Sequence, residues 1–134
     1  MPTGTAGSTA RDFHTNQTHY LTKAVDYTTL NAIPMGTVPA NCLITRVYAC
    51  VTTAFAGASA NNVSVGLSGN GTTIAAAISV LSVGVKLDTT TLATAAAAVF
   101  NPTADSVVIA TFGSTGATTT SGTATVVVEY INAR

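Results

Sequence analysis

Apolar and polar residues alternate along most of the chain with a period of two, which is typical of β-strands with one buried face. The pattern starts near residue 19 and predicts about eight short strands separated by turn residues. This spacing favours an all-β, antiparallel β-sandwich, and eight strands in two sheets favour a jelly roll. The predicted strands are 19–30, 31–35, 42–53, 63–67, 72–87 as one strand or two, 106–112 and 123–131, and a short helix competes with a strand over 92–100.

Turn residues mark the boundaries between these strands. The clearest predicted turn is Gly36–Asn41, and Ser68–Gly71 has the Asn-Gly chemistry of a hairpin. Loops are expected at 56–61 and 113–122. Pro34 cannot donate a backbone hydrogen bond, so strand 31–35 is expected at a sheet edge or strand end.

Two predicted strands are apolar on both faces. In strand 42–53, Leu43, Val47, Ala49 and Val51 share one face, and Ile44, Arg46, Tyr48 and Cys50 share the other. Strand 123–131 alternates in the same way, with Glu129 as its lone charge. We expect one face of each strand on the core and the other on a neighbouring chain. Arg46 and Glu129 then either face solvent, pair across the sheet, or make a polar contact at a subunit interface.

The first 18 residues differ from the rest. They are mostly small and polar, and Phe13 is their one large apolar side chain apart from Met1. We therefore divide the chain into an extended arm, 1–18, and a single sandwich domain, 19–134. The arm is expected to lie across a neighbouring chain, with Phe13 as its anchor.

Composition narrows the function. Charged residues make up 7% of the chain, apolar residues 47%, and the net charge is zero. No basic cluster is available for nucleic acid, and no apolar run is long enough for a transmembrane helix, so neither nucleic acid nor membrane is expected as a partner. A neutral, apolar chain tends to self-associate, which predicts a homotrimer or a homodimer.

Candidate chemistry is sparse. Cys42 and Cys50 are eight residues apart in one predicted strand, about 26 Å, which is beyond disulfide reach. We expect both to be reduced and buried. His14 and His19 are a weak metal pair without further ligands. We therefore expect no metal, no cofactor and no catalytic residue, although four Asp and one Glu leave an enzyme as a minor alternative.

Several short motifs point to a known group. The sequence carries Gly36-Thr37-Val38-Pro39-Ala40-Asn41, Ile44-Thr45-Arg46-Val47, Val51-Thr52-Thr53-Ala54-Phe55, Asn62–Gly66 and Thr125–Ile131. Over residues 30–131 it resembles small virion proteins of tailed bacteriophages. The resemblance implies a capsid decoration, or cement, protein on the outer surface of the head, which clamps adjacent major capsid protein subunits.

The tentative interface residues are Phe13, Arg46, Tyr48 and Glu129. The main alternative function is a tail or tail-fibre sandwich that binds a host-surface ligand. Sugar-binding modules use exposed aromatic side chains, and this chain has four Phe, four Tyr and no Trp, which counts against that alternative.

Overall fold

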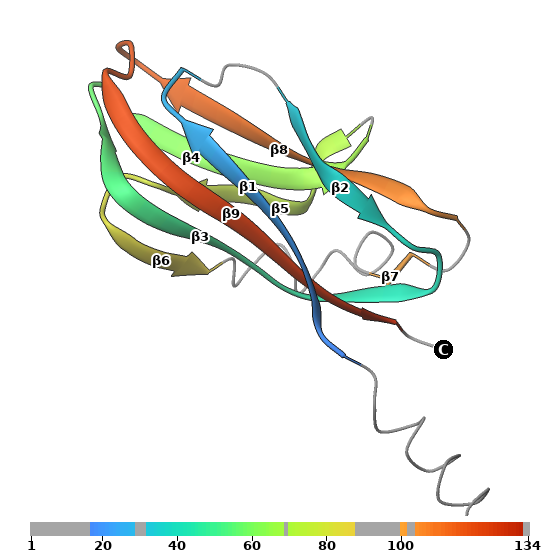
Figure 1. The fold of residues 1–134 in the computed structure, drawn as a ribbon. Helices are drawn as coiled ribbons and strands as arrows, with labels where there is room; N and C mark the ends of the chain where they lie inside the picture. Colours follow the sequence, from blue (N-terminus) through green and yellow to red (C-terminus); the bar gives the residue numbers. More distant parts are fainter. Residues whose placement is uncertain (1–16, 29–31, 69, 88–99, 102–103, 133–134) are drawn as a thin grey trace, which may run out of the picture.

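The computed structural model describes residues 17–28, 32–68, 70–87, 100–101 and 104–132. These residues form nine β-strands and no helix (Figure 1). The strands are β1 (His19–Asp26), β2 (Ile33–Val38), β3 (Cys42–Ala56), β4 (Ala60–Leu67), β5 (Asn70–Ser79), β6 (Gly84–Leu87), β7 (Phe100–Asn101), β8 (Ser106–Thr115) and β9 (Ser121–Asn132).

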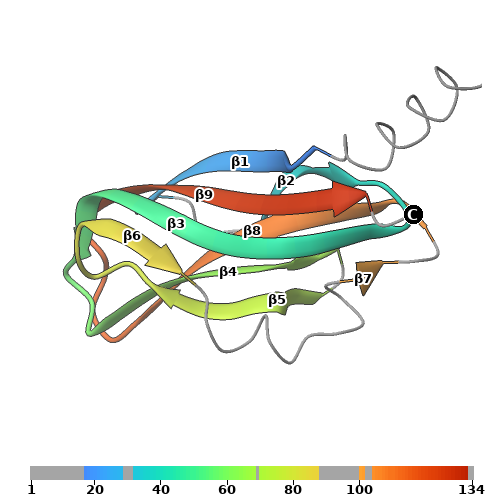
Figure 2. The same cartoon turned by 90° about the horizontal axis from the view of Figure 1, so that it is seen from below.

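Two antiparallel sheets pack face to face (Figure 2). Sheet A has the order β1-β9-β3-β6, with β7 also paired to β3, and sheet B has the order β2-β8-β4-β5. The chain crosses between the sheets at most connections, and the β4–β5 hairpin joins neighbours within one sheet. This is the jelly-roll arrangement of eight strands, with β7 as an addition. The predicted sandwich and jelly roll are confirmed.

The inner faces of the two sheets form a core of small aliphatic side chains. Val126 and Val128 of β9 point inward with no exposed surface, as the alternation of this strand predicts. At one end of the core the rings of Phe55 and Phe112 lie 5.0 Å apart, centroid to centroid. Valine-rich strands pack closely across a sandwich, so this chain fills its core with few aromatic residues.

A β-bulge in β3 overturns the predicted faces of that strand. The register with β9 shifts between Ile44 and Arg46, and one extra residue reverses the alternation beyond it. Ile44 is therefore buried with Val47, whereas Leu43 is only partly buried. The prediction that Leu43 shares a face with Val47, and Ile44 a face with Arg46, is wrong.

The same bulge separates the two cysteines. Both are free, but Cys42 is buried on the inner face and Cys50 is half-buried on the outer face. The prediction of two core cysteines is correct for Cys42 and wrong for Cys50. Burial raises the pKa of the Cys42 thiol and outweighs an opposing backbone hydrogen bond.

Other boundaries also differ from the predictions. Residues 36–38 of the predicted turn belong to the end of β2, where the Val38 side chain is buried in the core. The turn is therefore limited to residues 39–41, and Asn41 adopts φ 60°. Segment 72–87 forms two strands in different sheets, and the predicted loops at 56–61 and 113–122 are shortened by β4, β8 and β9. β1 ends at Asp26, whose carboxylate accepts hydrogen bonds from the backbone and hydroxyl of Thr28.

β2 lies at the edge of sheet B and carries a bulge beside Pro34, as the proline predicts. Residues 92–99 of the segment with a competing helix and most of the predicted arm 1–18, Phe13 included, lie outside the described residues, and Phe100 begins β7. The division into arm and sandwich stays a prediction.

Candidate interaction surface

The outer face of sheet A combines side chains from four strands in aligned rows. Strand pairing places Thr22 of β1, Val127 of β9, Tyr48 of β3 and Leu87 of β6 side by side. The next row contains Ala24, Thr125, Cys50 and Val85. Val127 is only 7% exposed although it points away from the core, and Thr22 and Tyr48 lie on either side of it. The centre of this face is therefore weakly polar.

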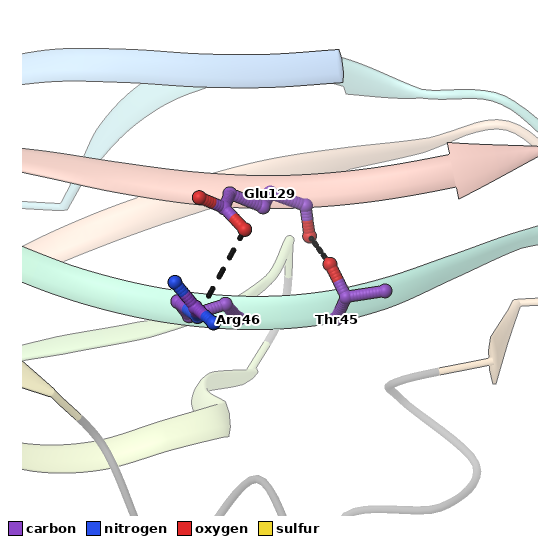
Figure 3. Close-up of polar contacts among 3 residues, drawn as sticks. All are labelled: Thr45, Arg46 and Glu129. Atoms are coloured by element: carbon purple, nitrogen blue, oxygen red, sulfur yellow. Dashed lines mark hydrogen bonds and ion pairs between the residues drawn. The ribbon is translucent and has the colours of Figure 1, made fainter. Parts of the chain in front are cut away.

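One ion pair stands on this face. Arg46 and Glu129 are directly opposed on β3 and β9, and Nε of Arg46 lies 4.0 Å from Oε2 of Glu129 (Figure 3). The Arg46 side chain is 58% exposed and the Glu129 side chain 15%. The hydroxyl of neighbouring Thr45 donates to the Glu129 backbone carbonyl at 3.4 Å (Figure 3). The pair leaves the guanidinium accessible and holds the carboxylate against the sheet.

Two tyrosines flank the same carboxylate. Tyr20 is directly opposed to Glu129 on β1, and Tyr48 lies one row along on β3. Burial, the negative charge of Glu129 and a hydrogen bond to its side chain all raise the pKa of the Tyr48 phenol, burial most strongly. The phenol therefore stays neutral over the whole physiological pH range, and because its proton points to Glu129, its oxygen can accept a hydrogen bond from a partner.

The structure thus brings together three of the four interface residues suggested by the sequence. Arg46, Tyr48 and Glu129 lie on one face, and of the alternatives that the sequence left open for Arg46 and Glu129, the structure shows the pairing between neighbouring strands. Phe13 lies outside the described residues. That these side chains contact another chain stays a prediction.

Sequence reasoning missed a second feature of this surface. Four of the seven exposed large hydrophobic side chains in the described residues fall between positions 81 and 87. They are Leu81 (44% exposed), Val83 (62%), Val85 (62%) and Leu87 (51%), and we name this set the aliphatic ridge. The sequence does carry a signal for it, since apolar and polar residues alternate strictly from Leu81 to Leu87.

The other polar and ionisable side chains considered as possible sites make contacts within the fold. The ring of His19 stacks on Tyr130 at 5.3 Å between centroids. Inside the sandwich, the hydroxyl of Thr119 donates to the side-chain oxygen of buried Asn61. Within the described ranges, no group of three or more His, Cys, Asp or Glu side chains could hold a metal ion. No helix in the same ranges is long and apolar enough to cross a bilayer.

Comparison with solved structures identifies the fold. A chain in the capsid asymmetric unit of cyanophage Pam1 matches with a TM-score of 0.62 and 19% identity, over 87% of this chain and 85% of that chain. This chain therefore shares its fold with a chain of that capsid structure. A chain in the acidic stable capsid structure of Helicobacter pylori bacteriophage KHP30 matches with a TM-score of 0.62 and 12% identity, over 85% of this chain and 86% of that chain.

The two likenesses confirm, at the level of the fold, the resemblance to bacteriophage virion proteins. They span nearly the whole of each chain, so the capsid chains and this chain are of similar length. No protein-family model matches the sequence. No curated protein matches it either.

Proposed function

We propose that this protein is a structural component of a phage virion, without catalysis, that decorates the outer surface of the head. It would stabilise the shell by clamping adjacent major capsid protein subunits. The observation that carries the proposal is the jelly roll shared, nearly end to end, with chains of two phage capsid structures. A small chain of this kind strengthens a shell by burying surface against it.

The centre of the outer face of sheet A is the surface we assign to the shell. It is largely uncharged, and the ion pair that the described residues place on it can give direction to a contact. Arg46 keeps an exposed guanidinium, and Tyr48 supplies a neutral hydroxyl beside it. Aromatic and arginine side chains dominate the energetics of protein interfaces because they combine large contact area with directed hydrogen bonds.

The outer face of sheet B has fewer exposed large side chains that could make a contact. In the described part of the chain its one exposed large hydrophobic side chain is Val107, at 38%. The neighbouring outward positions carry partly exposed Ile109 and small or polar residues such as Thr37, Ser64 and Thr111. This difference between the faces supports sheet A as the contact surface.

The test is an add-back experiment with phage heads produced without the gene for this chain. Recombinant protein should bind these heads saturably and raise the temperature at which they release DNA. Tyr48→Ala should weaken binding at least tenfold, whereas Val107→Ala on sheet B should bind like the wild type. Failure to bind heads, together with recovery of the protein in purified tails, would instead establish the tail module.

A further inference from the structure

The aliphatic ridge consists of Val85 and Leu87 on β6 and of Leu81 and Val83 in the bend before it, and the described residues leave it without a cover. The alternating pattern Leu81-Ser82-Val83-Gly84-Val85-Lys86-Leu87 is that of a strand with one buried side. The described residues leave its four aliphatic side chains between 44% and 62% exposed. Soluble proteins rarely expose so concentrated an apolar set unless it meets a partner.

The ridge also lies on a sheet edge, and the other edges of the sandwich are protected. β1 places Lys23 in the middle of its edge, and β2 carries Pro34 with a bulge. β5 is irregular, with two register shifts against β4. Charges, prolines and bulges are the usual devices that prevent strands from pairing at an edge.

β6 is a short strand that begins at Gly84, with φ 122°, and it carries neither a proline nor a bulge. It pairs with β3 in regular register over all four residues, and β6 ends the order of sheet A. Its one charge, Lys86, is turned back along its own segment, where Nζ donates to Ser82 Oγ at 2.8 Å. A charge held in this way does not project across the edge.

We propose that β6 pairs antiparallel with β6 of a second copy of this chain, about a two-fold axis at Val85. Sheet A would then continue through the contact into the sheet A of the partner. Val85 would oppose Val85 of the partner subunit, and Val83 would oppose Leu87 of the partner subunit. This inference goes beyond the function proposed above and does not depend on it.

The sequence of β6 fits this register. Pairing about Val85 sets Lys86 opposite a glycine, Gly84, instead of opposite a second lysine. A Cβ atom built at Gly84 would meet nothing within 4 Å, so the space that the lysine stem needs is open. Val83, Val85 and Leu87 then each meet an aliphatic side chain, and like charges are kept apart.

The self-complementary sequence of β6 favours a second copy of this chain over a different partner. A two-fold contact requires one strand to complement itself, in hydrogen bonding, shape and charge. The free edge of β6 supplies the hydrogen-bonding groups, and the residue pattern centred on Val85 supplies the complementary shape and keeps like charges apart. The contact also leaves Arg46, Tyr48 and Glu129 uncovered for another chain.

The test places charges on the two-fold axis. Sedimentation velocity of the full chain should show a dimer, and Val85→Lys and Val85→Glu should each raise the dimer dissociation constant at least tenfold. An equimolar mixture of the two variants should dimerise again, because lysine then opposes glutamate. Val107→Lys on β8 is the matched control, and it should dimerise like the wild type.

Engineered disulfides test the register. Cys50 is directly opposed to Val85, which lies between positions 83 and 87. A cysteine introduced at either position could therefore bond to Cys50 within the same chain, and the assay uses a Cys50→Ser background to prevent this. In that background, Val83→Cys mixed with Leu87→Cys should form a crosslinked heterodimer on mild oxidation, and each variant alone should crosslink far less.

Three results would overturn the proposal: a wild-type chain that stays monomeric at high concentration, a trimer, or a dimer that Val85→Lys leaves intact. None of them concerns phage heads, so the proposal can fail while the function above stands. Circular dichroism of each variant verifies that it is folded.

Discussion

Arg46 and Glu129 face each other across β3 and β9 because a β-bulge beside Arg46 turns its side chain to the outer face of sheet A. If β3 alternated strictly, without the bulge at Thr45, Arg46 would share the inner face with Ile44. The bulge therefore places the single ion pair of this face. It also lies beside the tyrosines that we expect at the contact with the shell.

The ion pair should matter little for folding. Arg46 is 58% exposed, and exposed pairs contribute between 0 and about 1 kcal/mol. We expect Arg46→Ala to lower the free energy of unfolding in urea by less than about 1 kcal/mol. The same variant should bind phage heads at least tenfold more weakly. A large loss of stability without a loss of binding would show that the pair serves the fold alone.

Tyr48 should make folding depend on pH in the alkaline range. Its pKa in the folded chain is raised above the ordinary value of 10.0 by burial, and then by Glu129. The unfolded chain therefore loses the phenol proton first, so stability is fully present below pH 10.0 and falls as the pH rises toward the folded pKa.

Ultraviolet titration of the phenol, compared between the wild type and Tyr48→Phe, measures this pKa. Glu129→Gln should lower it, because the variant removes the negative charge beside the phenol. An unchanged titration of Tyr48 in Glu129→Gln would contradict the assigned contact.

Gly122 should be essential for the core. It lies at φ +140°, and a Cβ there would run into the ring of Phe55. We expect Gly122→Ala to cost about 1–3 kcal/mol in the free energy of unfolding, because the ring has to shift in a packed core. Gly113→Ala is the control, since a Cβ at Gly113 meets nothing within 4 Å. Equal melting temperatures for the two variants would contradict this packing.

The sequence predicted the features that depend on local residue patterns, namely the buried faces of regular strands and the edge position of a strand that contains proline. β9 shows the predicted faces, with Val126 and Val128 buried, and Pro34 lies on an edge strand. Bulges depend on pairing between distant strands, and no local pattern marks the one after Ile44, so the face of Cys50 was predicted wrongly. Strand order was also beyond local patterns, because jelly-roll neighbours such as β3 and β9 are far apart in sequence.

The candidate surface was predicted in part. Arg46, Tyr48 and Glu129 stood out as polar residues in apolar strands, and the structure places them on one face. The aliphatic ridge did not stand out, because its alternation reads as an ordinary half-buried strand. Only the three-dimensional arrangement shows that the expected cover is missing from the described residues.

Cryo-electron microscopy of virions that contain this chain tests the central claim most directly. The account predicts jelly-roll density on the outer surface of the head, with the outer face of sheet A seated across adjacent shell subunits and Tyr48 in the contact. Jelly-roll density confined to the tail, or head density whose sheet A faces solvent and touches no shell subunit, would contradict it.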